Sequence, residues 1–513
     1  EMFAKALEMS LEESTVVWVA QGNRFYPMSN KVQISTDLVA GVDIASLAPY
    51  TERFIGQEGG TLRVATSGLL TGAWNALNGQ DWVQEVVVQR TTVDDAVFVD
   101  PYTGLYWPQR LERAEVVTTT GTPMNKSLDW VDLSFADEIQ VPADAWADWD
   151  AAKQEFIPVS TKYPDGTTAQ TKLTIYYPES LYDVKMHDGS TISVGDFIVN
   201  IIQFFDTAKP ESPIYDEAQV PAFESFMTYF KGVKVVSTDP LVIETYVDTF
   251  DMDAEVLIGA NRWGTWFPSQ TNNAYSPVFW DTFAVASLAE ENRELAFSQD
   301  KATALNVTWT HYIDGPSLEI LKKYLDLAQA ESYIPYATTA GKYITKEEAD
   351  TRYANLQQFY ATYNHFWVGS GPYYLDEVNS VEGSLVVKHF ADFPDMADKW
   401  SRFSEPMLPV VDASGPSKVT IGEDATFDVL ISFKDAAYPS ENLENVPFLL
   451  YAADGTMVGK GEAELVSEGQ YAVKLTSDLT SRLSEGTSQM EIIAVSKVVS
   501  VPVFATVTFI VGK

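Results

Sequence analysis

The chain has 513 residues, 46% of them hydrophobic and 13% aromatic, which is enough for a large folded core and for more than one domain. Its 72 acidic and 34 basic residues give a net charge of −38, which repels nucleic acid and anionic lipid headgroups and excludes both as expected partners. The absence of cysteine excludes disulfides, thiol catalysis and cysteine-ligated metals.

The first 60 residues contain few periodic segments. Residues 1–13 have the apolar spacing of an amphipathic helix, and Thr15-Val-Val-Trp-Val19 has the composition of a short buried strand. The chain does not open with a basic, apolar signal sequence, and no apolar run of about 18 residues follows. We therefore expect no membrane span, and we expect residues 1–60 to be the tail of an upstream lobe.

A second domain is expected to begin after Gln57-Glu-Gly-Gly60, because Thr61-Leu-Arg-Val-Ala-Thr66 has the composition of a strand. Two loop-like stretches of this domain combine aromatic and polar residues, as a cleft for a flexible polar ligand requires. The first stretch follows the predicted strand and the second begins near residue 261. Their candidate ligand-binding residues are Trp74, Asn75, Asp81, Trp82, Trp263, Trp266 and Tyr275.

Burial in the core is an equally good interpretation for any single one of these tryptophans, because the chain contains 13 of them. What favours the binding interpretation is that they cluster in sequence of loop character. Asn75 and Asp81 are the polar side chains expected to hold an amine or a hydroxyl group.

Regular elements are predicted more firmly between residues 170 and 365. Leu173-Thr-Ile-Tyr-Tyr177 predicts a strand, and Ser193 with Asp196 predicts the capped start of a buried helix over 194–206. Two apolar runs around Thr238-Asp-Pro240 predict a hairpin. Helical periodicity then predicts helices over 317–332 and 346–363, the second capped by Thr345 and Glu348.

No motif indicates an enzyme or a cofactor. The four histidines share no metal-ligand spacing, and neither a Gly-x-Ser-x-Gly elbow nor a phosphate-binding glycine loop is present. The acidic run over residues 144–150 lacks the glycine and distal glutamate of a calcium loop, so it is expected to cap a helix at Ala151. With 72 acidic residues, a glycosidase carboxylate pair stays an open alternative.

From residue 405 to the end, the pattern changes to short alternating runs separated by turns. Ala425–Ile431, Tyr471–Leu475 and Met490–Val495 are examples, and Asp454-Gly455 is typical of a tight hairpin. About 105 residues of this kind without a helix predict an all-β, immunoglobulin-like sandwich over 405–513.

Two motifs about 180 residues apart resemble a known family. Asp183-Val-Lys-Met-His-Asp-Gly189, with Ile192 and Asp196, precedes the buried helix, and Gly369-Ser-Gly-Pro-Tyr-Tyr374 comes later. Together and in this order they resemble the oligopeptide/dipeptide/nickel-type (family 5) solute-binding proteins of ABC importers. The first motif has the character of scaffold, and the second resembles the family's crossover strand near the hinge between two lobes.

The resemblance implies an α/β (α+β) periplasmic-binding-protein-like lobe with a mixed sheet and helices over 61–404, followed by the sandwich. It implies an extracytoplasmic, monomeric protein, tethered through a missing N-terminal region, that captures a peptide-like or oligosaccharide ligand between lobes. The protein would then deliver that ligand to the transmembrane subunits of an ABC permease. Trp367, beside the hinge motif, would line the cleft.

The chain departs from the family's usual order. The β-sandwich follows directly after His389-Phe-Ala-Asp-Phe393, where the family places its second lobe, and residues 1–19 resemble the family's closing helix and strand. A truncated or permuted arrangement is the simplest account. Two other functions stay open: a cell-surface adhesion or glycan-binding protein, and a surface glycoside hydrolase.

Overall fold

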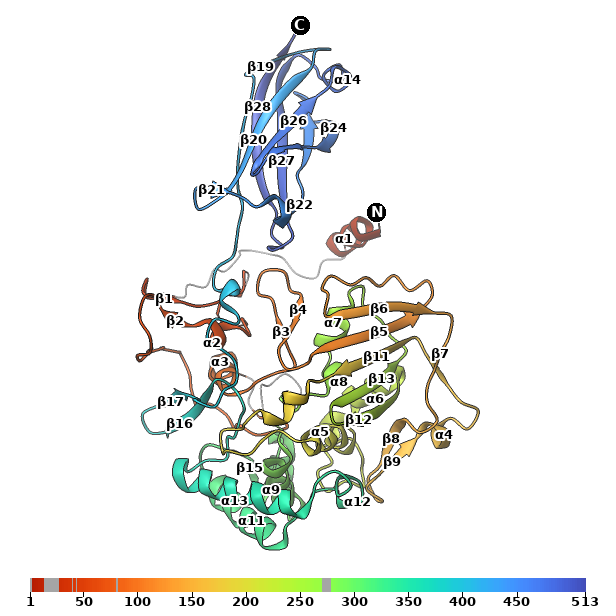
Figure 1. Ribbon diagram of the computed structural model, residues 1–513, viewed down its shortest axis with the longest axis vertical. Helices are drawn as coiled ribbons and strands as arrows, with labels where there is room; N and C mark the ends of the chain where they lie inside the picture. The colour runs from red at the N-terminus through yellow and green to blue at the C-terminus, as the bar shows by residue number, and fades with distance from the viewer. Residues whose placement is uncertain (1, 13–26, 39, 43, 80–81, 270–277) are drawn as a thin grey trace.

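The computed structural model describes residues 2–12, 27–38, 40–42, 44–79, 82–269 and 278–513 (Figure 1). The protein is mixed α/β: strands gather into sheets of two to seven, and helices form the minority. Among the described residues, no helix combines the length and the apolar character needed to cross a membrane. The predicted N-terminal helix is present as α1 (Met2–Glu12), whereas Thr15–Val19 lies outside the described residues.

A seven-stranded sheet with the order β6-β5-β11-β13-β12-β8-β9 forms the centre of the molecule. Only β5 and β6 run parallel; the other neighbouring strands are antiparallel. The predicted strand at Leu173 is β11, the third strand in this order, and the predicted hairpin is β12–β13. The strands are β5 (Arg113–Thr119), β6 (Val131–Ala136), β8 (Trp146–Asp150), β9 (Glu155–Pro158), β11 (Thr171–Tyr176), β12 (Phe230–Thr238) and β13 (Leu241–Val247).

Helix α5 (Val194–Asp206) confirms the helix predicted from its capping residues. The Asp196 carboxylate accepts the Ser193 N–H at 2.8 Å, which holds the first turn closed. The expected apolar stripe is fully buried in the main hydrophobic core, and burial of this stripe fixes the helix against the sheet. Its buried members are Phe197, Ile198, Ile201, Ile202 and Phe205.

A group of helices lies together beneath the sheet in Figure 1: α9 (Trp280–Glu291), α11 (Ser317–Glu331) and α13 (Lys346–Tyr363). α11 and α13 confirm the two predicted helices, and Thr345 Oγ1 accepts the Glu348 N–H at 3.1 Å as the predicted cap. Shorter helices join this group or flank the sheet: α4 (Val159–Lys162), α6 (Val220–Tyr229), α7 (Ala254–Gly259), α8 (Arg262–Thr265), α10 (Gln299–Leu305) and α12 (Ala337–Ala340).

One buried arginine ties three helices together. Arg352 of α13 donates to Asp196 of α5 at 2.5 Å and to Asp281 of α9 at 3.3 Å. All three side chains are inaccessible or nearly so, at 3%, 0% and 0% exposure. Because both carboxylates are buried, their charges depend on this single guanidinium for compensation.

The part of the molecule beside the sheet is built from short elements of the first 108 residues and from the later hairpin β16–β17. Helix α3 (Val83–Thr92) packs near the hairpin β16–β17 that follows the Gly369 motif. These elements are β1 (Val32–Gln33), α2 (Ala48–Thr51), β2 (Arg53–Phe54), β3 (Val97–Val99), β4 (Tyr106–Pro108), β16 (Tyr373–Asn379) and β17 (Ser384–His389).

The C-terminal region forms two sheets around a hydrophobic core of its own. One sheet has the order β18-β20-β26-β25 and the other β19-β28-β27-β23-β24, and inward residues such as Phe427, Leu450 and Ile492 are buried between them. The strands are β18 (Val410–Ser414), β19 (Lys418–Thr420), β20 (Ala425–Phe433), β23 (Pro447–Tyr451), β24 (Met457–Glu462), β25 (Glu464–Ser467), β26 (Gln470–Leu475), β27 (Gly486–Ser496) and β28 (Val503–Gly512).

The turn between β27 and β28 reaches the first part of the molecule. Val499 is 1% exposed and packs in a separate cluster with Phe98, Tyr102 and Trp400, and the Ser500 N–H donates to Tyr102 O at 2.8 Å. The C-terminal strands therefore contact the rest of the chain at this turn as well as through the covalent connection at residues 404–409.

Three local predictions are wrong. Residues 61–66 form no strand and are all exposed, because no sheet edge among the described residues pairs with them. Asp150 does not cap a helix; its carboxylate accepts the Lys153 N–H at 3.0 Å within the tight turn between β8 and β9. The C-terminal region is not free of helix, since α14 (Ser477–Thr480) supplies one turn.

Candidate functional site

The two motifs of the sequence resemblance meet at His187. The His187 N–H donates to Gly369 O at 2.9 Å, and the Gly369 N–H donates to His187 Nδ1 at 3.2 Å. Because Nδ1 accepts, the ring proton lies on Nε2, which donates to Gly371 O at 3.0 Å. One imidazole thus joins segments that are about 180 residues apart in sequence.

Burial keeps this imidazole neutral. His187 is 9% exposed, and burial lowers its pKa from 6.5 to about 4. His365, just before the second motif, is also buried, with its pKa lowered to about 4 and its Nε2 at 3.0 Å from Leu375 O. Neutral histidines therefore brace both sides of the Gly369 segment at ordinary pH.

Acidification is expected to weaken this junction. A histidine with a lowered folded-state pKa stabilises the fold above pH 6.5, and that contribution is lost as the pH falls toward 4, because the unfolded chain takes up the proton first. The stability difference between the wild type and His187→Asn should shrink by about 3 kcal/mol between pH 7.5 and pH 4. Urea unfolding at the two pH values measures it. His389→Asn, at the exposed end of β17, is the control. If the stability difference from the wild type changes with pH equally for both variants, the pH dependence does not come from the buried imidazole of His187.

The predicted residues Trp74 and Trp367 come together, but inside the core. Both are fully buried, with ring centroids 4.9 Å apart in an edge-to-face arrangement. Trp367 Nε1 donates to Thr92 Oγ1 at 2.7 Å, and Trp74 Nε1 donates to the buried carboxylate of Glu85. Their polar edges are therefore already satisfied within the protein, and other side chains cover their rings.

Asn75 is also fully buried, and its side-chain amide forms hydrogen bonds with backbone groups of three segments. Its Nδ2 donates to Phe297 O at 2.9 Å and Thr310 O at 3.0 Å, while its Oδ1 accepts two N–H groups of the following turn. All four hydrogen-bonding positions of the amide are occupied, so none is left for a ligand in this structure.

The second predicted stretch is buried as well. Trp263 lies in α8 and is 4% exposed; Trp266 follows it, is fully buried and donates from Nε1 to Thr245 Oγ1 at 3.0 Å. Of the predicted residues that the structure describes, Trp82 is the accessible one, at 49% exposure, just before α3. Asp81 and Tyr275 lie outside the described residues. A direct ligand contact for these eight residues stays a prediction.

A small cavity of about 50 Å³ opens where the two predicted stretches meet. Asn78 comes from the first stretch and Arg262 from the second, and helices α5 and α6 complete the walls. A cavity of this size holds one small polar or charged group rather than a whole solute. The lining residues are Leu77, Asn78, Gln203, Phe204, Thr207, Gln219, Ala222, Phe223 and Arg262.

Arg262 is the charged residue that lines this cavity. Its Nη2 donates to Asn200 Oδ1 at 2.6 Å, its Nε is buried without a hydrogen-bond partner, and no ion pair to it occurs within the described residues. Burial lowers the pKa of the guanidinium to about 9, with no carboxylate nearby to offset the effect. A carboxylate or phosphate entering the cavity would supply the missing partner.

Arg262 is not among the residues predicted from the sequence to bind a ligand, although the sequence around it contains a feature that could have indicated it. It is the one basic residue in the aromatic segment 261–268, and a lone cation among buried aromatic residues is unusual. Over the described part of the chain, no three His, Asp or Glu side chains lie close enough together to hold a metal ion.

Comparison with known proteins gives little. No family model matches the chain, and no curated protein matches it. One similar solved structure is the CARDB domain of a Pyrococcus furiosus protein in complex with di-metal ions, at 15% identity and a TM-score of 0.15. The match covers 20% of this chain and 87% of that domain. A TM-score this low carries no argument about fold or function.

Proposed function

We propose that the chain is the solute-binding component of an ABC importer, acting outside the cytoplasm. The observation that carries the proposal is the His187 junction, where the two motifs of the resemblance are joined by three hydrogen bonds. This contact supports the proposal that residues 369–374 lead to an inter-lobe hinge.

In this proposal residues 61–404 form one lobe, residues 1–60 are the tail of an upstream lobe, and residues 405–513 are an immunoglobulin-like sandwich. The mixed sheet with its helical layer supports the first assignment, and the two sheets around a separate core support the last. A ligand would stabilise the closed arrangement of the lobes through its higher affinity for that state. The closed form would then present the ligand to the permease.

The ligand proposed is peptide-like, and its terminal carboxylate would enter the cavity at Arg262. The guanidinium, whose Nε has no hydrogen-bond partner among the described residues, favours a carboxylate over a neutral group, while the small volume admits only the end of the ligand. We further propose that Trp82, which is exposed and lies four residues after Asn78 in sequence, contacts the remainder of the ligand.

A thermal-shift comparison tests this proposal. The full chain is heated with trialanine and with trialanine amide, which lacks the terminal charge. At about 100 times its dissociation constant, a ligand adds roughly 2.7 kcal/mol of stability, so trialanine should raise the melting temperature by a few degrees and the amide by less. Arg262→Met should abolish the difference, whereas Arg482→Met, in an exposed ion pair of the C-terminal region, should preserve it.

Two outcomes would contradict the proposal in different ways. If neither trialanine, its amide nor a wider peptide library shifts the melting temperature, the proposed import of peptides is wrong and the adhesion alternative gains. If trialanine shifts the wild type and Arg262→Met equally, the import function stands but the ligand terminus binds elsewhere.

A further inference from the structure

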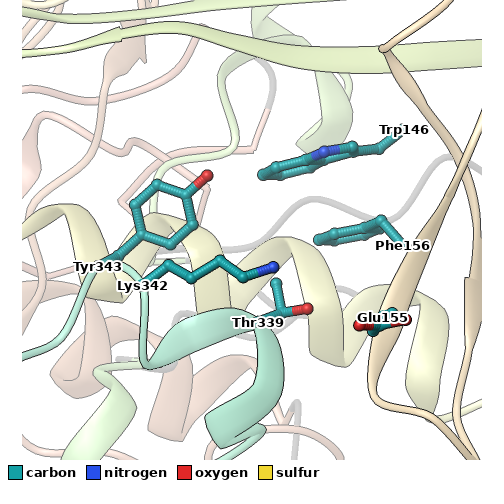
Figure 2. A pocket seen from close by; sticks show the side chains of 6 residues that line it. All are labelled: Trp146, Glu155, Phe156, Thr339, Lys342 and Tyr343. Atoms are coloured by element: carbon teal, nitrogen blue, oxygen red, sulfur yellow. The ribbon is translucent and has the colours of Figure 1, made fainter.

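A second, larger cavity lies away from the Arg262 site, between the β8–β9 hairpin and the end of α12 (Figure 2). Its volume is about 300 Å³, at the lower end of the roughly 300–1,000 Å³ typical of small-molecule pockets. The lining residues are Trp146, Glu155, Phe156, Thr339, Lys342 and Tyr343. Neither the import function nor the candidate residues from the sequence involve this cavity.

One wall of the cavity is a rigid aromatic stack. The rings of Trp146 and Phe156 lie 4.1 Å apart and within 3° of parallel. Phe156 is backed in turn by Trp149, which is 2% exposed and meets it edge-to-face at 4.9 Å. Because the stack rests on the core, a ligand that contacts it need not first order the wall.

The opposite wall carries polar groups that face the stack. In Figure 2 the Tyr343 hydroxyl points toward Trp146, and the Lys342 ammonium extends into the space beside the rings. Thr339 Oγ1 donates to Gln154 O at 2.8 Å, which fastens α12 to the hairpin turn and holds the two walls together.

Four polar groups around the cavity lack an internal partner. Among the described residues, no hydrogen bond or ion pair reaches Trp146 Nε1, the Glu155 carboxylate, the Lys342 ammonium or the Tyr343 hydroxyl. The indole N–H and the ammonium only donate, the carboxylate only accepts, and the phenol does both. Glu155 and Lys342 are exposed to solvent, and Trp146 and Tyr343 are half-buried, so a ligand that replaces water at these groups must offer donors and acceptors together.

We propose that this cavity binds a neutral saccharide ring. Hydroxyl groups both donate and accept, so a pyranose can pair with the donor-only and the acceptor-only groups at once. Its C–H faces would lie against the aromatic rings. An anionic ligand is disfavoured by Glu155 and by the net charge of −38, and a cationic one leaves the ammonium and the indole N–H unmatched.

Saturation-transfer NMR and titration calorimetry on the full chain test this site. The probes are methyl α-glucopyranoside, maltose and N-acetylglucosamine, with phenethylammonium and acetate as counter-probes. At least one saccharide should bind, and Tyr343→Phe and Lys342→Ala should each weaken its binding roughly three- to tenfold, the range expected for one hydrogen bond. Trp146→Ala should remove binding, and Lys460→Ala, at an exposed lysine of the C-terminal region, should leave it unchanged.

Tyr343→Phe keeps the experiment decisive, because it removes one hydroxyl and preserves the ring, whereas Trp146→Ala can disturb the hairpin. The proposal is overturned if no saccharide binds, or if a saccharide binds with equal affinity to the wild type and to both the Tyr343 and Lys342 variants. Binding of phenethylammonium that depends on Tyr343 and Trp146, without saccharide binding, would assign the cavity to aromatic cations instead. Peptide binding at Arg262 is independent of all these outcomes.

Discussion

Replacing Arg352 by methionine is expected to lower the free energy of unfolding by about 3–5 kcal/mol. The substitution keeps most of the side-chain volume but leaves Asp196 and Asp281 buried without their shared cation. Burial already raises the pKa of Asp281 even with the guanidinium present, so the uncompensated carboxylate would be costly to ionise. Urea unfolding followed by circular dichroism measures the loss.

Lys346→Met on the same helix is the matched control. Lys346 forms an exposed ion pair with Asp350 at 2.9 Å, and such surface pairs contribute no more than about 1 kcal/mol. The contrast between two ion pairs on one helix isolates the effect of burial. Equal stability of Arg352→Met and Lys346→Met would show that the three-helix connection does not stabilise the fold.

Gly369→Ala is expected to cost at least about 3 kcal/mol, because the added methyl group has no space. A Cβ at this position would lie 1.8 Å from Thr92 O and 3.1 Å from His187 Cε1. The first neighbour is backbone at the end of α3, which cannot rotate away as a flexible side chain would. Relief of the clash must therefore displace the Gly369 segment from α3 and break its hydrogen bonds with His187.

Gly383→Ala separates this clash from the general cost of replacing a glycine. Gly383 lies in the turn between β16 and β17 with φ of +64°, and no atom lies within 4 Å of the position of an added Cβ. Only the left-handed backbone conformation opposes the substitution, at about 1 kcal/mol. If both variants unfold at the same urea concentration, the close packing of the Gly369 segment against α3 is not important for stability.

The elements predicted from sequence were those whose local signals and burial agree. Helix α5 has both a capping pair and a continuous apolar stripe, and α13 has the Thr345 cap and buried residues at helical spacing. In the C-terminal region, alternation predicted β20, β26 and β27, and the Asp454-Gly455 turn joins β23 to β24, whose hairpin pairing is local.

The predictions that failed depended on distant partners. Residues 61–66 have strand composition, but a strand also requires a neighbouring edge, which composition does not reveal. Burial depends on distant partners as well: Trp74 lies in loop-like sequence, yet its ring packs against Trp367, almost 300 residues away, and composition does not reveal this contact. Sequence reasoning missed Arg262 because the lack of a hydrogen-bond partner for its buried Nε is visible only in the folded structure. It missed Trp146 because the stacking of that ring on Phe156 is likewise visible only there.

The turn between β27 and β28 has a mechanical consequence. The C-terminal strands are joined to the remainder of the chain by the peptide connection and also by Val499 and Ser500 against Tyr102. Because the C-terminal strands are attached both at residues 404–409 and at Val499 and Ser500, they resist rotation relative to the rest of the chain, and the easiest remaining motion is bending about the line that joins the two attachments. Tension applied at the far C-terminal end, the uppermost point in Figure 1, would therefore reach the aromatic cluster around Trp400 directly, and the region would behave as a stiff arm rather than as a loose tether.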